Sequence, residues 1–232
     1  MAEPDALRAS GSPQKGGAPT SAPRRRLSPD ERRNELLTLG AEVFGQRPYD
    51  EVRIDEIAEK AGVSRALMYH YFPDKRAFFA AVLRAESERL FEATNAPPRP
   101  GLGLFDQLRE GVIAYLRYYE ENPNVAWAAY VGNGSSDPVL RGIEDTDTDR
   151  QAERIVAAFG GDQLDAKVER DVRIIAYGWI AFTLEMCRQR MLDPSIDIDR
   201  VADACAHTVL DGVARVPGIP EALAEAIAAA RP

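Results

Sequence analysis

The stretch IAEKAGVSRALMYHYFPDKR, residues 57–76, places two short helical patterns on either side of one glycine. Apolar residues recur at helical spacing over 54–61, and Gly62 ends that pattern because glycine adopts the left-handed backbone without strain. Ser64 is a favoured N-cap residue, so a second helix is expected to begin there and to run to about Tyr71. Two helices joined by a tight turn with glycine predict a helix-turn-helix.

The second of these helices carries a row of large rings, although it is too short to be stable alone. At 3.6 residues per turn, Met68 and Phe72 continue the apolar face of residues 54–61. We therefore expect these two side chains to lie in the core and to anchor the short helix to its neighbour.

Another face of the same helix has residue types that contact DNA. Arg65 lies at the helix N-terminus beside the small Ala66, so the helix end can approach the floor of a major groove and arginine can donate two hydrogen bonds to guanine. Tyr69, Tyr71 and Lys75 carry donors that are expected to reach phosphates on either side. Either tyrosine alone fits a place in the core or on the surface equally well, so the prediction depends on the whole pattern.

Charge is unevenly distributed along the chain. The net charge is −8, but residues 1–90 hold 15 basic against 14 acidic side chains, and the remainder holds 14 against 23. An acidic body repels a phosphate backbone, so DNA binding is expected of the N-terminal part. No apolar run is long enough to span a bilayer and the N-terminus lacks the apolar core of a signal peptide, so we expect a cytoplasmic protein with no membrane partner.

Two cysteines and two histidines leave little scope for metal or redox chemistry. Cys187 and Cys205 form neither a disulfide framework nor a paired metal motif, and His70 and His207 have no ligand partner at metal spacing. Both cysteines are expected in the core, and no metal or cofactor is expected. The chain also lacks a Gly-rich phosphate loop and a Gly-x-Ser-x-Gly elbow, which argues against an enzyme.

The chain divides into a tail and two helical parts. Residues 1–27 are rich in Ala, Ser, Gly and Pro and are expected to be disordered. Their basic run at 24–26 could enter a minor groove, but a charge run before a domain is more often simply solvated. A Pro-rich break at 95–101 separates the helix-turn-helix domain with its connecting helix, 28–93, from a helical body, 94–232.

No strand pattern stands out, and the fold class is all-α. The first helix is expected to begin at Ser28, which forms a capping box with Glu31. Beyond the break, helical periods cover 104–119, 125–131, 139–159 with an interruption around Gly142, 165–190, 199–213 and 221–230.

From about residue 31 to residue 83 the sequence resembles the DNA-binding domain of TetR/AcrR-type transcriptional regulators. The matching positions are Leu36, Leu37, Phe44, Tyr49, Asp50, Ile57, Ala58, 61–64, Met68, Tyr69, Tyr71, Phe72 and Lys75. The resemblance implies a three-helix DNA-binding domain joined by a fourth helix to an all-α ligand-binding and dimerisation domain. This agrees with the helical periods beyond residue 102.

The resemblance also implies base contacts from Arg65 and Ala66, with backbone contacts from Tyr69, Tyr71 and Lys75. Two positions depart from the family pattern. Arg53 stands where a small hydroxyl residue usually caps the second helix and touches phosphate, and Pro48 stands where glycine is common. An arginine can reach phosphate but cannot cap. The expected DNA-binding residues are Arg53, Ser64, Arg65, Ala66, Tyr69, His70, Tyr71 and Lys75.

The helical body offers aromatic side chains for a ligand cavity. Rings on several helices could converge between them, where ligand sites are common, although each ring alone fits a plain core. Few polar groups compete for this interior, so the small-molecule effector is expected to be largely apolar, with Thr183, Glu185 and Arg188 as candidates to orient it. The candidate ligand-binding residues are Tyr115, Tyr119, Trp127, Tyr130, Trp179, Phe182, Thr183 and Met186.

The helix predicted over 165–190 is apolar on two faces and must therefore be buried on two sides. Its second face carries Ile174, Gly178, Ala181, Phe182 and Cys187. With the helix over 199–213 it is expected to form the interface of a homodimer, which would read a palindromic operator in double-stranded DNA. Ligand entry is expected to displace the helix over 75–93 and to change the separation of the two reading helices.

The predicted function is that of a dimeric transcriptional repressor that a small effector releases from its operator. Two alternatives stay open. A transcriptional activator of the same fold differs only in where the operator lies relative to the promoter, which a protein sequence does not contain. A ligand-independent DNA-binding protein is disfavoured because the large acidic body repels DNA.

Overall fold

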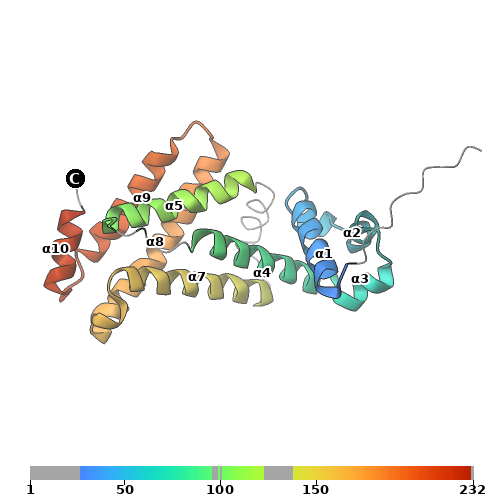
Figure 1. Ribbon diagram of the computed structural model, residues 1–232, viewed down its shortest axis with the longest axis horizontal. Helices are drawn as coiled ribbons and strands as arrows, with labels where there is room; N and C mark the ends of the chain where they lie inside the picture. The colour runs from blue at the N-terminus through green and yellow to red at the C-terminus, as the bar shows by residue number, and fades with distance from the viewer. Residues whose placement is uncertain (1–26, 96–98, 100, 123–137, 231–232) are drawn as a thin grey trace, which may run out of the picture.

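The computed structural model describes residues 27–95, 99, 101–122 and 138–230. All regular structure in this part of the chain is helical, which confirms the all-α fold (Figure 1). The helices are α1 Pro29–Phe44, α2 Ile54–Ala61, α3 Arg65–Tyr71, α4 Lys75–Thr94, α5 Leu104–Glu121, α7 Pro138–Ala158, α8 Ala166–Leu192, α9 Ile198–Val213 and α10 Glu221–Ala229, with 3₁₀ turns η1 Tyr49–Glu51 and η2 Gly161–Gln163. The helix expected over 125–131 and the basic run at 24–26 lie outside the described residues.

Local capping accounts for the bounds of the first three helices. The Ser28 hydroxyl accepts from the Glu31 backbone N–H at 3.1 Å while the Glu31 carboxylate accepts from the Ser28 backbone N–H at 2.7 Å, so the expected capping box is present. Gly62 has φ 65°, and the Val63 N–H returns to the Ala58 carbonyl at 2.9 Å, which ends α2. The predicted ends of α2 and α3 are confirmed.

Aromatic packing holds the three short helices together. Met68 is 0% exposed and Phe72 is 2% exposed, which confirms that α3 is anchored through these two side chains. The Phe72 ring meets Phe78 of α4 edge-on, with 4.8 Å between ring centroids. The same hydrophobic cluster reaches Leu140 and Ile143 of α7, so α7 takes part in the core of the helix-turn-helix.

The helix α4 connects the two parts of the molecule. Figure 1 shows it leading from α1–α3 at one end of the elongated chain into a body of α5, α7, α8 and α9. Within that body α9 packs against both α5 and α8, and α7 packs against α8. Trp179 of α8 donates its indole N–H to the carbonyl of Cys205 in α9 at 2.6 Å, which fixes these two helices to each other.

Two expectations for the body need correction. The helix α7 continues without interruption through Gly142, because one exposed glycine lowers helix propensity but removes no backbone hydrogen-bonding group. Cys187 is 0% exposed and packs with Leu116 and Cys205, so it does not belong to the second apolar face of α8. The prediction that both cysteines are core residues is confirmed. None of the helices in the described ranges is long and apolar enough to cross a membrane.

The contact between α1 and α4 is unusually close at Gly40. A Cβ atom there would lie 2.5 Å from Cζ of Phe78 and 2.7 Å from Cγ2 of Val82, and both of these side chains are fully buried. The Phe78 ring is packed against the rings of Phe44 and Phe72, so it cannot move aside without displacing them. Any residue larger than glycine at this position therefore has to push α1 and α4 apart.

We expect Gly40→Ala to lower the free energy of unfolding by about 1 kcal/mol, because overpacking outweighs the gain of about 1 kcal/mol in helix propensity. Gly142→Ala is the matched control, since nothing lies within 4 Å of its added Cβ. The control should raise the free energy of unfolding by about 0.5–1 kcal/mol. Denaturant unfolding measures both, and equal stabilisation by the two variants would contradict the close packing.

Candidate DNA-binding face and ligand cavity

The exposed side of α3 gathers four of the residues predicted to bind DNA. Arg65, Ala66, Tyr69 and His70 are all exposed, and 41% of Tyr69 is accessible. Their exposure follows from the anchoring of Met68, because a helix of under two turns that buries one side must present the other to solvent. This face is free to meet another molecule.

Arg65 is held by a partner on another helix, which the sequence pattern does not predict. Its Nη2 atom lies 2.8 Å from Oδ2 of Asp55 in α2, while 70% of the arginine side chain remains exposed. An exposed ion pair adds little stability, but it limits the directions in which the guanidinium points. Arg65 and Asp55 are ten positions apart across the turn, a spacing that no periodicity rule connects.

The remaining predicted DNA contacts have structural roles as well. The Ser64 hydroxyl caps α3 by accepting from the Leu67 N–H at 3.1 Å. Tyr71 is half-buried against the core. Lys75 donates to the Asp50 carbonyl at 3.3 Å, and its ammonium lies 4.4 Å from the centre of the Tyr49 ring. These three residues therefore also stabilise the positions of α3, η1 and α4.

Arg53 stands at the N-cap position of α2, and its side chain is exposed. It makes no capping hydrogen bond, in agreement with the expectation that arginine cannot cap. The exposed guanidinium remains available to a phosphate.

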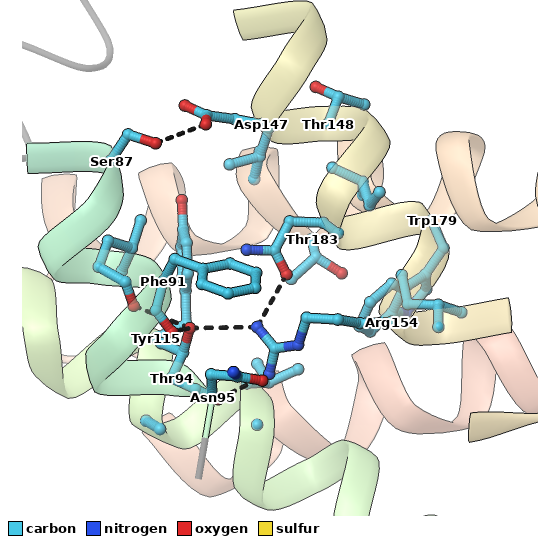
Figure 2. Close-up of a pocket in the computed structure, with 18 of the residues that line it drawn as sticks. Ser87, Phe91, Thr94, Asn95, Tyr115, Asp147, Thr148, Arg154, Trp179 and Thr183 are labelled. Carbon is cyan, nitrogen blue, oxygen red and sulfur yellow. Dashed lines mark hydrogen bonds between the residues drawn. The ribbon is translucent and has the colours of Figure 1, made fainter. Parts of the chain in front are cut away.

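A cavity of about 900 Å³ lies in the body, between α4, α5, α7 and α8 (Figure 2). Tyr115, Tyr119, Trp179 and Thr183 line it, as do Phe91 and Leu90 of α4. The Tyr115 hydroxyl donates to that of Tyr119 at 3.3 Å. A mostly apolar lining with a few polar groups is typical of small-molecule sites, and the volume is near the top of their usual range of about 300–1,000 Å³.

One end of this cavity is basic. Arg154 of α7 donates through Nη2 to the carbonyl of Thr94 at 2.7 Å and through Nη1 to the Thr94 hydroxyl at 3.4 Å and to Gln151 Oε1 at 3.2 Å. Burial lowers the pKa of Arg154, which still leaves a cation at neutral pH. Figure 2 shows Arg154, Thr94 and Asn95 together at this end.

The opposite end of the cavity is acidic. Burial raises the pKa values of Glu86, Glu144 and Asp147, although Arg89 opposes the shift at Glu86 and Ser87 opposes it at Asp147. Figure 2 shows Ser87 and Asp147 apart from Arg154, with the Phe91 ring between the two ends. The lining therefore changes charge along the length of the cavity.

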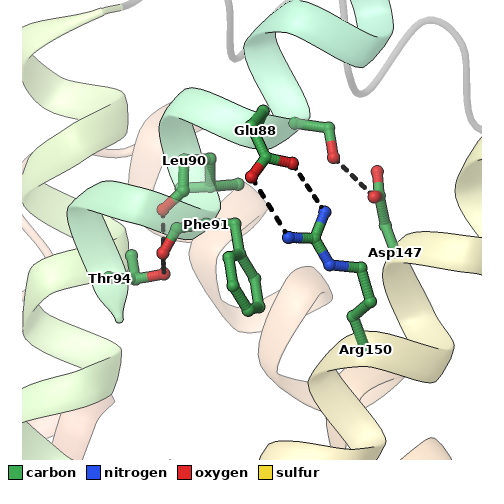
Figure 3. Close-up of polar contacts among 7 residues, drawn as sticks. Glu88, Leu90, Phe91, Thr94, Asp147 and Arg150 are labelled. Carbon is green, nitrogen blue, oxygen red and sulfur yellow. Dashed lines mark hydrogen bonds and ion pairs between the residues drawn. The ribbon is translucent and has the colours of Figure 1, made fainter. Parts of the chain in front are cut away.

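Polar contacts join α4 to α7 beside the cavity (Figure 3). The Ser87 hydroxyl donates to Asp147, and Arg150 donates to both carboxylate oxygens of Glu88 at 2.8 and 3.3 Å. The Arg150 guanidinium carbon also lies 3.8 Å from the centre of the Phe91 ring. Residues with higher numbers on α4 contact residues with higher numbers on α7: Ser87 contacts Asp147, and Thr94 contacts Arg154. The two helices therefore run parallel.

Comparisons with known proteins identify the fold and the class of protein. Residues 36–82 match the model of the family described as bacterial regulatory proteins, tetR family. The HTH-type transcriptional activator FasR of Mycolicibacterium smegmatis is 27% identical over 83% of this chain and 87% of its own length. The DNA-binding part of the chain is that of the TetR family. Like its relatives, this protein is a DNA-binding transcriptional regulator and not an enzyme.

Other relatives of this regulator match over shorter stretches or in fold alone. The HTH-type transcriptional repressor Rv1474c of Mycobacterium tuberculosis is 28% identical over 37% of this chain and 39% of its own length. A tetR-family transcriptional regulator from Streptomyces coelicolor has the same fold, with a TM-score of 0.72, 23% identity, and coverage of 88% of this chain and 90% of that one.

The cavity includes half of the ligand-binding residues expected from the sequence. Tyr115, Tyr119, Trp179 and Thr183 line it. Phe182 does not, because 37% of it is exposed on the outer side of α8, and Met186 packs with Val112 and Val201 instead. Trp127 and Tyr130 lie outside the described residues. Of the polar candidates, Glu185 and Arg188 pair with each other on the surface and take no part in the cavity.

The polar residues of α7 were missed from the sequence. Glu144, Asp147, Gln151 and Arg154 recur at spacings of three and four, so they share the helix face that also holds the buried Ile143 and Ile155. Aromatic rings are the usual sign of an apolar cavity, whereas charged side chains at helical spacing usually form a solvated face. On this face of α7 the polar side chains alternate with buried apolar ones, and that mixture was the available sign that they face the interior.

We expect Asp147→Asn to raise the melting temperature of this regulator at pH 7. Because burial raises the folded-state pKa of Asp147, the folded state binds this proton more tightly than the unfolded state, and stability falls as pH rises through both values. Asparagine keeps an acceptor for Ser87 and has no charge to bury.

The stabilisation by Asp147→Asn should shrink near pH 4, where the wild-type carboxyl becomes protonated. Thermal unfolding at both pH values measures the difference. Asp145→Asn, on the exposed side of the same helix, is the control, and its effect on the melting temperature should differ less between the two pH values because this side chain is not buried. A gain for Asp147→Asn that is the same at both pH values would contradict the buried-charge interpretation.

Proposed function

We propose that this regulator is a dimeric repressor that leaves a palindromic operator when a small, largely apolar effector occupies the cavity. The observation that carries the proposal is the double role of α4. Phe78 and Phe79 of this helix lie in the core that holds the helix-turn-helix, whereas Leu90 and Phe91 line the cavity. A ligand that moves the second half of α4 therefore also moves the DNA-binding part.

The exposed face of α3 supports its role as the reading helix. Arg65 and Ala66 lie at its N-terminal end, where side chains of a helix inserted in the major groove meet base edges. Tyr69 and His70 extend from the same exposed side, and Arg53, Ser64, Tyr71 and Lys75 surround it at positions suited to phosphate contacts. The Asp55 carboxylate positions Arg65 until guanine takes its place as acceptor.

The outer face of α8 supports dimerisation. Ile174 is 63% exposed and Phe182 is 37% exposed, and the small residues Gly178 and Ala181 lie between them on an open surface. Such a face, one helix long and apolar, is typical of an interface covered by an equivalent helix of a second copy. A two-fold pair then places two α3 helices toward successive major grooves.

The proposed coupling acts through the separation of those two helices. Effector binding has to favour the released form, because a ligand with equal affinity for both forms shifts nothing. The contacts between α4 and α7 are the ones that a ligand in the cavity can change, since Ser87, Thr94, Asp147 and Arg154 belong both to those contacts and to the lining.

A transcriptional activator is the second candidate. It is favoured by the FasR relative, which is named an activator and aligns over most of both chains. Repressor and activator of this fold bind DNA in the same way, so the position of the operator relative to the promoter decides between them. Transcript levels with and without the regulator, for a promoter that carries the operator, distinguish the two.

Selection of bound duplexes from a random DNA pool is expected to yield a two-fold palindrome. On that operator, Arg65→Ala should cost about 1–3 kcal/mol of binding free energy and relax the base preference, because one bidentate contact with guanine is lost. Tyr69→Phe should weaken all sequences alike, because a phosphate contact carries no base information. Fluorescence anisotropy measures both variants.

Arg215→Ala is the control for these variants, since it removes an exposed arginine from the residues that follow α9, far from α3. It should leave operator affinity unchanged. Wild-type affinity and base preference in both α3 variants would show that another surface reads DNA.

Ile174→Glu is expected to convert the dimer to a monomer and to weaken operator binding. A charge buried without a partner in the interface should raise the dimer dissociation constant by about 100-fold or more. Light scattering on a size-exclusion column measures the mass. Val139→Glu, which places the same charge at an exposed apolar position of α7, is the control. If Ile174→Glu stays dimeric, as the control does, the interface lies on another face.

A further inference from the structure

The guanidinium of Arg154 has only neutral partners among the described residues. Its hydrogen bonds go to the carbonyl and hydroxyl of Thr94 and to the Gln151 amide, its carbon lies 5.2 Å from the centre of the Phe91 ring, and no carboxylate of the described ranges pairs with it. The other arginine of the lining, Arg99, is paired with Glu110. Arg154 is therefore a partly buried cation without a counter-ion, at the edge of an apolar cavity.

Such a cation is costly to desolvate without an anion nearby, so it is rarely placed in an interior with no function. The lowered pKa of Arg154 reports this cost, because burial is its cause and no carboxylate opposes it. Two of its three hydrogen bonds are long, at 3.2 and 3.4 Å. A carboxylate would make shorter, charge-assisted hydrogen bonds, and its two oxygens could bind the guanidinium in a bidentate way.

Four acidic side chains line the cavity; Glu110 is paired with Arg99, and the other three, Glu86, Glu144 and Asp147, lie away from Arg154. Asp147 and Glu144 precede Arg154 by seven and ten positions in α7, which separates them from it by about 10 to 15 Å along the helix axis. Glu86 is eight positions before Thr94 in the parallel helix α4, a separation of about 12 Å. An anionic group is repelled from the acidic end and attracted to the basic one.

We propose that the effector is an elongated, largely apolar molecule with one carboxylate group, which binds the Arg154 guanidinium while the apolar body lies against Phe91, Tyr115 and Trp179. This inference rests on the proposed function, in which the cavity is the effector site. It adds the chemical class of the ligand and its direction in the cavity.

The same guanidinium connects the ligand to the DNA-binding part. Its shortest hydrogen bond, 2.7 Å, goes to the carbonyl of Thr94, the last residue of α4. A carboxylate competes for these donors and weakens the hold of α7 on the end of α4. Arg154 thus acts both as the ligand's counter-ion and as a contact that changes when the ligand binds.

A matched ligand panel tests the class of effector. Dodecanoate and an arylalkanoate are each compared with the methyl ester, the alcohol and the amine of the same skeleton, by thermal shift and then by calorimetry on the full chain. The carboxylates should bind about ten- to a hundred-fold more tightly than their esters, as expected for hydrogen bonds to a charged group. If no carboxylate binds more tightly than its ester, or if the amines bind best, the proposal is wrong.

Variants of Arg154 test the site. R154Q should reduce the preference for carboxylate over ester to about twofold or less, and R154K should keep part of it, because lysine supplies charge without the bidentate hydrogen bonds. R150Q is the matched control, since Arg150 is one turn away and also contacts α4, but pairs with Glu88 and does not line the cavity. Equal loss of the preference in R150Q and R154Q would show a general loosening of α7 and overturn the assignment.

Operator binding separates this inference from the function on which it rests. Carboxylates should weaken operator binding by the wild type and by R150Q but not by R154Q. If an ester or amine releases DNA as well as its carboxylate does, the effector-responsive regulator stands and the carboxylate class falls. If carboxylates bind through Arg154 and operator affinity does not change, the carboxylate class of ligand is supported and the proposed coupling to DNA binding is contradicted.

Discussion

The burial of the first half of α4 in the helix-turn-helix core is the constraint on which the rest of the molecule depends. Phe78 touches Phe72, which closes α3, and lies so near Gly40 that α1 has no room to shift. With 8 and 7 residues, α2 and α3 are too short to be stable alone, and together with α1 they take their positions from this helix. Any displacement of α4 therefore moves α1, α2 and α3 together as one body.

The second half of α4 is held in a different way. Its contacts with α7 are mostly polar, through Ser87, Glu88 and Thr94, and they lie beside a cavity. Polar contacts exchange partners at low cost when a new donor or acceptor arrives, whereas close-packed aromatic rings resist displacement. The helix thus joins a rigid contact with the DNA-binding part to an adjustable contact with the body. Because of this difference, a ligand in the cavity can shift the second half of α4 while the first half keeps its contacts with α1–α3.

The helix-turn-helix was predictable because its determinants are local. Ser28, Gly62 and Ser64 act through hydrogen bonds and backbone angles of neighbouring residues, so the bounds of α2 and α3 were read correctly. The anchoring of Met68 and Phe72 followed from helical period alone. The interruption expected at Gly142 was wrong because one glycine lowers helix propensity without preventing a helix.

The cavity was only half predictable. Aromatic rings such as Tyr115 and Trp179 could be named from composition and period, but a ring looks the same in sequence whether it fills a core or lines a cavity. The Arg154–Thr94 and Arg65–Asp55 contacts join residues on different helices, and no spacing rule relates them. The sequence by itself determined the helices, their caps and which side of α3 is buried, because these depend on near neighbours. Only the tertiary structure decided which polar side chains meet inside the body, because that depends on how α4 and α7 align in space.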